Sequence, residues 1–244
     1  SDDCLIRVNA TDSSAMMSSD TSNATFTVDS TPPFVNVRAP NGGEIWRGGT
    51  SHQINWTMWD NYQDLLNPIN IYYSINAGVN WSVLSLNEPN DGTYTWLVPV
   101  VTSDDCIVRI NASDYAGNQG YDMSDALFTI DSTPPFVNVL RPNGGERVRG
   151  GFNYYINWTM WDNFAEPVKP IELYYSADAG LSWVLIAKNE SNDGSYTWSV
   201  PPINSPQCLA RVNATDAAGN RNQDRSDGVF TIDSTLPGIE VLSP

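Results

Sequence analysis

The sequence is poor in the residues on which most enzyme and nucleic-acid sites depend. It has a single histidine, His52, and only two lysines. No Ser/His/Asp arrangement, phosphate-binding loop or zinc cluster occurs in it. Its 28 acidic residues outnumber its 12 basic residues, which gives a formal net charge of −16. Because phosphate binding needs a basic face, we expect no nucleic acid partner. Because the residues of common active sites are missing, we expect a protein that is not an enzyme.

Long apolar runs and paired cysteines are also missing. Without a run of 18 apolar residues, no membrane span is predicted for this segment. The three cysteines, Cys4, Cys106 and Cys208, lie 102 residues apart. One cysteine per 102 residues excludes a disulfide within such a unit. Because Cys106 starts an alternating run with Val108 and Ile110, we expect a buried thiol that packs as a small hydrophobe.

What the chain does have is a tandem repeat. The stretch Asp131–Val139 also occurs from Asp29 and, more loosely, from Asp233, at intervals of 102 residues. We predict these domains: 1–30, the C-terminal part of a preceding repeat; 31–132 and 133–234, complete repeats; and 235–244, the first strand of a following repeat. The partial ends predict a segment of a longer array, and completion by strands of neighbouring molecules is the alternative.

Alternating apolar residues predict strands throughout the repeat. Ile54, Trp56 and Met58 share one face, and Ile71 and Tyr73 share another, with turn signals between such runs. About seven short strands in 100 residues, without helical periodicity, predict an all-β fold in which each repeat is a two-sheet β-sandwich.

Three stretches carry a resemblance to a known family, namely Pro40–Glu44, Ile54–Trp56 and Arg211–Asn220. With the predicted strands, they resemble the immunoglobulin-like and fibronectin III-like repeats of prokaryotic, particularly archaeal, cell-surface proteins. The resemblance implies tandem Ig-like (fibronectin III-like) two-sheet β-sandwich domains and an extracellular, cell-surface location. The cysteine pair between the sheets of antibody domains is absent here.

Acidic loops are the sharpest candidate site. In such a sandwich, the loops after the second, fourth and sixth main strands should meet the segment that enters the domain. Their oxygen ligands suit Ca²⁺. The candidate interdomain calcium ligands are Asp29, Asp60, Asn61, Asp91, Asp114 and Asn118 in the first repeat, and Asp131, Asp162, Asn163, Asp193, Asp216 and Asn220 in the second. Capping of turns by Asp and Asn is the alternative, and no other cofactor is predicted.

Two further sets of surface residues are candidates. Eight Asn-X-Ser/Thr sequons predict a glycoprotein: Asn9, Asn23, Asn55, Asn80, Asn111, Asn157, Asn189 and Asn213. Four of these asparagines lie on predicted outward faces, at positions 55, 111, 157 and 213. Trp59 and Trp161 point outward at a strand end, and Trp46 is replaced by Val148 in the second repeat. These three tryptophans are the candidates for contact with a ligand or partner.

A third motif, Ser176–Trp183, matches the Asp-box pattern, and Ser74–Trp81 is a degraded copy of it. The Asp side chain is expected to cap backbone amides of a hairpin, with no catalytic role.

Together these features predict a structural extracellular protein, a tandem Ig-like array that forms a cell-surface filament, stalk or S-layer-like element. Its partners would be other copies of itself or neighbouring repeats of a longer chain. The alternative is an adhesin or carbohydrate-binding array that binds surface glycans through exposed tryptophans.

Overall fold

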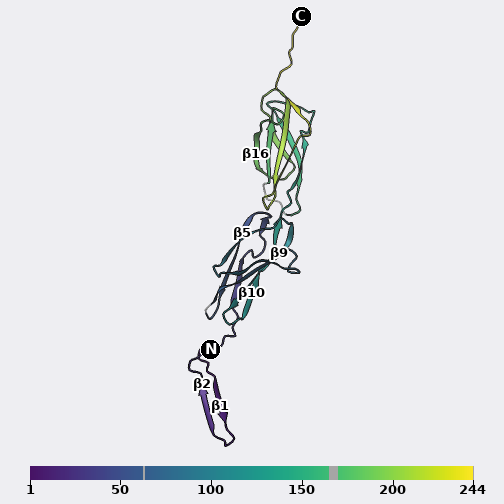
Figure 1. Ribbon diagram of the computed structural model, residues 1–244. Coiled ribbons are helices and arrows are strands. Elements are labelled where there is room, and N and C mark those ends of the chain that lie inside the picture. The colour runs from purple at the N-terminus through teal and green to yellow at the C-terminus, as the bar shows by residue number, and fades with distance from the viewer. Residues whose placement is uncertain (63, 165–169, 244) are drawn as a thin grey trace. The chain divides into compact units, whose positions relative to one another are not determined.

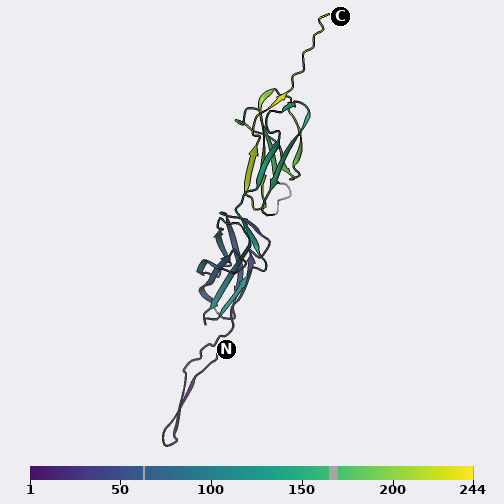
Figure 2. The same ribbon diagram turned by 90° about the vertical axis from the view of Figure 1, so that its right-hand side faces the viewer.

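A computed structural model describes residues 1–62, 64–164 and 170–243, and Figures 1 and 2 show it from two sides. Every regular element among these residues is a β-strand. The described residues contain no helix of the length and apolarity that crossing a membrane requires. The chain divides into two compact units, Ser1–Pro99 with Ser103–Ile130, and Val100–Thr102 with Asp131–Pro244. The finer domain boundaries expected from the sequence remain a prediction.

The described residues of the first repeat form nine strands in two sheets. They are β3 (Phe34–Ala39), β4 (Ile45–Arg47), β5 (Ser51–Trp59), β6 (Asp64–Ser74), β7 (Ser82–Glu88), β8 (Thr93–Leu97), β9 (Ser103–Asp114), β10 (Gln119–Met123) and β11 (Phe128–Asp131). The smaller sheet has the order β3-β5-β8. The larger sheet has the order β4-β11-β9-β6-β7, and β10 also pairs with β9.

The second repeat has the same organisation. Its strands are β12 (Phe136–Arg141), β13 (Arg147–Arg149), β14 (Asn153–Trp161), β15 (Ile171–Ser176), β16 (Val184–Glu190), β17 (Ser195–Ser199), β18 (Ser205–Thr215), β19 (Arg221–Arg225) and β20 (Phe230–Asp233). The sheets are β12-β14-β17 and β13-β20-β18-β15-β16, with β19 paired to β18. Figures 1 and 2 show that the two layers face each other within each repeat.

Alternation along the strands builds the core, as the sequence predicts. In β5, Ile54, Trp56 and Met58 point inward and are 0%, 3% and 9% exposed. In β9, Cys106 and Val108 are fully buried, and Cys106 is a free thiol. Full burial of one such large apolar side chain contributes about 1.5–3 kcal/mol to folding. The predicted inward faces are therefore confirmed.

The last strand of each repeat is interrupted, which the sequence did not indicate. In the sequence, Ala126, Phe128 and Ile130 alternate and indicate a single closing strand. Instead, β10 and β11 both pair with β9, along different parts of its length. Between them, Ser124 turns inward, where its hydroxyl donates to the carbonyl of Pro40 at 2.7 Å. A buried serine satisfied by the backbone breaks the alternation that would have revealed β10.

The ends of the chain contribute little packing. Strands β1 (Arg7–Thr11) and β2 (Met17–Thr21) form a hairpin whose residues are all exposed. Residues 235–243 form no strand among the described residues, and the first strand of a following repeat stays a prediction. A strand needs a hydrogen-bonded neighbour, and in the described part of the chain this segment has none.

Candidate metal centre

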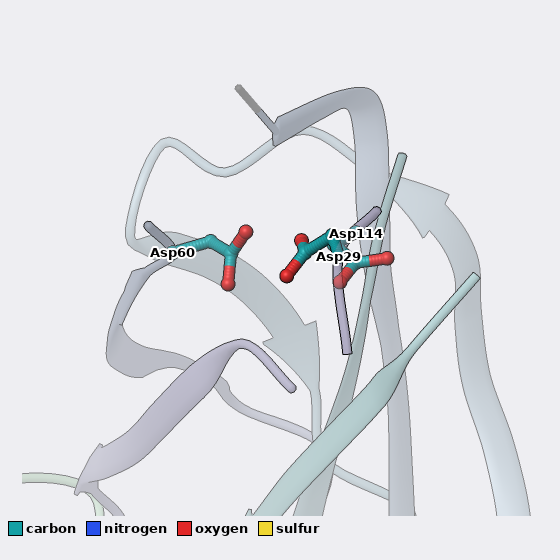
Figure 3. Close-up of side chains that lie close together, drawn as sticks. All are labelled: Asp29, Asp60 and Asp114. Carbon is teal, nitrogen blue, oxygen red and sulfur yellow. The ribbon is translucent and has the colours of Figure 1, made fainter. Parts of the chain in front are cut away.

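Three aspartates converge at one end of each repeat. In the first repeat they are Asp29, Asp60 and Asp114, and each offers a carboxylate oxygen within 4.8 Å of the others. Figure 3 shows their carboxylates drawn together from three separate segments. In the second repeat the equivalent residues are Asp131, Asp162 and Asp216, which meet the same distance limit. We name these sets the first and second acidic triads.

A tight turn positions the third aspartate of each triad. Asp216 follows β18, and its carbonyl accepts from the amide of Gly219, whose φ is 89°. Glycine adopts this left-handed conformation without the steric cost of a Cβ. The turn brings Asn220 back, so that its backbone and side-chain N–H groups donate to the two carboxylate oxygens of Asp216, each at 2.8 Å.

The asparagine of this turn also holds the segment that enters the repeat. The side chain of Asn220 donates to the carbonyl of Asp131 at 3.2 Å, and Asn118 makes the same bond to Asp29. Both asparagines were expected as calcium ligands. Their N–H groups instead donate to the carboxylates and orient them, which is the role of residues that support a metal site.

The second aspartate of each triad lies in the loop that follows the central strand of the smaller sheet. One oxygen of Asp162 accepts from the amide of Phe164 at 3.3 Å, and one oxygen of Asp60 accepts from the amide of Tyr62 at 3.2 Å. The other oxygen, Oδ1, is buried in both residues and has no hydrogen-bond partner among the described residues. A buried carboxylate oxygen without a partner is costly, and a bound cation would remove that cost.

The electrostatics of the second triad also favour a cation. Burial, followed by the charges of Asp131 and Asp216, raises the pKa of Asp162. Burial and the charge of Asp131 likewise raise the pKa of Asp216, although Asn220 opposes the shift through its hydrogen bonds. Ionised carboxylates this close repel one another, and a divalent cation converts that repulsion into attraction.

The donor set is of one chemical kind. Three carboxylates supply hard oxygen ligands, and neither triad contains a thiol or an imidazole. Ca²⁺ prefers such oxygens and completes its 6–8 ligands with carbonyls or water. The residues present therefore fit calcium.

The remaining predicted calcium ligands lie outside the triads. Asp91 accepts from the amide of Thr93, and Asp193 accepts from the amide of Ser195, both at 3.2 Å. These two aspartates cap turns, which was the alternative considered for them. Asn163 is exposed. The side-chain N–H of Asn61 donates to Asp29 at 3.4 Å, as a supporting residue would.

The structure separates the candidate tryptophans into two classes. Trp59 and Trp161 are 61% and 60% exposed, and each stacks on a phenylalanine of the neighbouring strand, Phe34 or Phe136, with ring centroids 5.6 Å apart. Trp46 is only 9% exposed. The prediction that Trp46 contacts a ligand is therefore wrong, because the short strand β4 directs this side chain into the core.

The sequons also differ in exposure. Asn9, Asn23, Asn80 and Asn189 are exposed. The four asparagines expected on open outward faces, Asn55, Asn111, Asn157 and Asn213, are half-buried.

Comparison with known proteins adds the context of the fold. No protein-family model matches the sequence, and no curated protein matches it. Among solved structures, the chain is similar to the fibronectin(III)-like modules of Clostridium thermocellum CbhA, with a TM-score of 0.46, 14% identity, and coverage of 86% of this chain and 100% of that chain. It is similar to a 1.5-MDa bacterial ice-binding adhesin, with a TM-score of 0.41, 15% identity, and coverage of 95% and 74%. It is also similar to the FN1–FN3 domains of chicken CNTN1, with a TM-score of 0.38, 16% identity, and coverage of 91% and 75%.

The strand order decides the fold class. The small sheet is β3-β5-β8 in the first repeat and β12-β14-β17 in the second, and the other strands of each repeat form the sheet opposite. Each repeat is an immunoglobulin-like, fibronectin III-like β-sandwich. These tandem sandwiches carry their acidic triads on the loops and on the entering segment, where such domains tolerate functional variation.

Proposed function

We propose that the chain is a structural, extracellular tandem array whose repeats are stiffened by calcium bound at the acidic triads. One observation carries the proposal: an aspartate of the segment that enters each sandwich is gathered with two aspartates of that sandwich's own loops. Asp131 is also the last residue of β11. A cation held by Asp131, Asp162 and Asp216 would therefore restrict the backbone that joins one repeat to the next.

The sequence around the entering segment supports a mechanical role. Two prolines, Pro134 and Pro135, follow Asp131 and limit the φ angles of the joint. The amide of Thr133 donates to Asp131 at 2.9 Å, which fixes the carboxylate relative to its own turn. We propose that such joints set the spacing of a filament, a stalk or an S-layer-like element at the cell surface.

The test uses one substitution under two conditions. In a chelator, Asp162→Asn should raise the melting temperature, because it removes an ionised carboxylate whose pKa is raised by burial and by two neighbouring charges. In calcium, the same substitution should lower the melting temperature, because a ligand is lost. This reversal of sign distinguishes a ligand from a turn cap. Loss of stability in both conditions would show that Asp162 only caps its turn and would sink the calcium proposal.

The assembly part needs a separate measurement. Negative-stain electron microscopy of the whole chain at high concentration, with calcium and with chelator, should show ordered polymers in calcium. Single dispersed particles in both conditions would contradict the filament.

A second candidate function rests on the stacked aromatic pairs. Trp59 with Phe34 and Trp161 with Phe136 place two exposed rings side by side at matching positions of both repeats. Exposed aromatic faces can stack on sugar rings, so an adhesin or carbohydrate-binding array is the alternative. Glycan-array binding that is lost in the Trp59→Ala and Trp161→Ala variant would favour it. Unchanged binding would exclude these pairs as the site.

A further inference from the structure

The outer face of β18 and β19 in the second repeat concentrates positive charge in an acidic chain. Arg211 and Arg225 are directly opposite each other in the antiparallel pair, and Arg221 lies on the same face of β19. The whole chain has only 12 basic residues against 28 acidic ones. Like charges that face each other across a strand pair destabilise it unless something of opposite charge lies between them.

The first repeat lacks this concentration. Its matching positions are Arg109, Met123 and Gln119, so only one of the three guanidinium groups is present there. The backbone pairing is the same in both repeats, because Arg109 pairs with Met123 as Arg211 pairs with Arg225. The additional charges are therefore not required to build the strand pair.

The guanidinium groups of the second repeat are not neutralised by the protein. Arg221 and Arg225 are exposed and make no hydrogen bond or ion pair with any residue that the structure describes. Arg211 is held between two aromatic rings, 4.5 Å from the centroid of Tyr174 and 4.4 Å from that of Trp183. Cation–π contacts of this kind fix the orientation of a guanidinium and leave its charge in place.

Two carboxylates lie on this surface, and each already accepts a hydrogen bond from the protein. Glu172 accepts from the hydroxyl of Tyr174 at 2.9 Å, and Asp224 accepts from the amide of Val139 at 2.7 Å. Three positively charged guanidinium groups and two negatively charged carboxylates leave this surface with a net positive charge. At physiological salt, charges more than about 8 Å away are largely screened, so a ligand would respond to this excess despite the net charge of the chain.

The surface is hollowed beside these charges. One hollow of about 310 Å³ is lined by Trp183, Arg211, Gln223, Asp224 and Arg225. A second, of about 280 Å³, is lined by Glu172, Asn213, Thr215, Arg221, Asn222 and Gln223. Because Gln223 lines both, the hollows adjoin and form a track along β19. The four-residue separation of Arg221 and Arg225 spans about 13 Å of strand.

We infer that this track binds a polysaccharide that carries uronic acid carboxylates. A guanidinium pairs with a carboxylate in bidentate geometry, and the arginines at either end of the track would each take one. The amide of Gln223 lies between them on the same face of β19, and the hydroxyl of Thr215 is opposite Arg221; both suit sugar hydroxyls. None of the residues that line the two hollows is an exposed large hydrophobic residue, so the track lacks the apolar centre that is typical of protein–protein interfaces. This site is independent of the acidic triads and of the stacked tryptophans.

The test measures binding of polygalacturonate to the whole chain, with dextran as the neutral control and poly-L-glutamate as the acidic polypeptide. We expect salt-sensitive binding of polygalacturonate and none of dextran. The double variant Arg221→Gln and Arg225→Met, which installs the residues of the first repeat, should weaken binding by at least about tenfold. The reciprocal variant Gln119→Arg and Met123→Arg should add a second site.

A charge-matched control separates the track from general attraction. Arg147 and Arg149 are exposed on β13 of the same repeat, and Arg147→Gln with Arg149→Gln removes the same two charges elsewhere. This control should change the affinity by less than about twofold. An equal loss in both variants, absence of polygalacturonate binding, or equally tight binding of poly-L-glutamate would overturn the inference.

Discussion

The two acidic triads use the same three positions of the repeat, but their surroundings differ. Asp131 is 1% exposed, whereas its counterpart Asp29 is half-buried. Burial opposes ionisation of Asp114, but hydrogen bonds from Asn118 and from backbone amides outweigh it and lower the pKa of Asp114. In the second triad the balance is reversed, and the pKa of Asp216 is raised. The two triads therefore have the same ligand types, but a bound cation should stabilise the second more than the first, because burial and neighbouring charge differ.

The largest expected effect is a difference in calcium dependence between the repeats. Saturation at 100 times the dissociation constant adds about 2.7 kcal/mol of stability, which corresponds to a rise of about 10–20 °C in the melting temperature of a 100-residue domain. We expect Asp162→Asn to remove most of the calcium-induced rise seen by differential scanning calorimetry, and Asp60→Asn to remove less. The turn caps provide the control, since Asp91→Asn and Asp193→Asn should leave the rise unchanged. Equal losses from Asp60→Asn and Asp162→Asn would show that burial does not set the affinity.

The second comparison concerns the cores. Trp46 stacks on His52 with ring centroids 4.4 Å apart and tilts against Phe128 at 5.2 Å. Trp46→Val leaves a cavity in this cluster and should cost about 2–4 kcal/mol, measured by urea unfolding.

The second repeat contains valine at this position and indicates a compensation. There Arg141 lies over the ring of Tyr154, 4.6 Å from its centroid, and donates to its hydroxyl at 2.7 Å. Adding Ala39→Arg and His52→Tyr to Trp46→Val introduces the same pair and should recover part of the loss. If the added substitutions recover none of the lost stability, the Arg–Tyr pair of the second repeat does not replace the packing of Trp46 in the first.

A smaller difference lies where the larger sheet approaches the entering segment. A Cβ on Gly120 would lie 1.9 Å from the carbonyl oxygen of Pro33. Its counterpart Asn222 instead donates its side-chain N–H to the carbonyl of Pro135 at 2.9 Å. We expect Gly120→Ala to destabilise the first repeat by about 1–3 kcal/mol through overpacking. Asn222→Ala should cost about 1 kcal/mol through the lost hydrogen bond, and a larger loss there than at Gly120 would contradict this explanation.

Much of the fold could be predicted because two strong signals agree. Alternation in runs such as Ile54–Met58 reveals the inward face of a strand, and the 102-residue interval aligns the two repeats position by position. Strand β10 was not predicted from the sequence, because its buried neighbour Ser124 is polar and because Gly120 carries no side chain. Trp46 was misplaced for a related reason, since a three-residue strand is too short for alternation to indicate its inward face.

The sequence predicted the location and the chemical type of the candidate site, but not which of the acidic residues and asparagines form it. Topology correctly gathers the loops and the entering segment at one end, so the three aspartates of each triad could be proposed. Sequence cannot show which turn-capping aspartate also faces a triad: Asp162 and Asp193 both accept from the amide two residues further on, but of the two only Asp162 belongs to a triad. That difference depends on side-chain direction.

The smallest expected effect comes from the Asp-box hairpins. The hydroxyl of Ser182, followed by the hydroxyl of Ser176 and the amide of Ser182, donates to Asp178 and lowers its pKa from 3.8 to about 2. In the first repeat, Asn76 occupies this position and cannot titrate. Because the folded pKa of Asp178 is depressed, its stabilising contribution is present above pH 3.8 and is lost as the pH falls towards 2.

Asp178→Asn should therefore lower the melting temperature slightly at pH 6, and the gap to the parent chain should close as the pH approaches 2. Asn76→Asp in the first repeat should create a pH-dependent contribution of the same sign but smaller size, because Asn80 stands where the second repeat has Ser182, whose hydroxyl contributes most to the lowered pKa of Asp178. Its matched control is Asn76→Ser, which removes the Oδ1 atom of Asn76 that accepts from the amide of Asn80 and adds no charge. A gap between Asp178→Asn and the parent chain that stays constant from pH 6 to pH 2 would show that the hairpin depends on the shape of the side chain at this position and not on its ionisation.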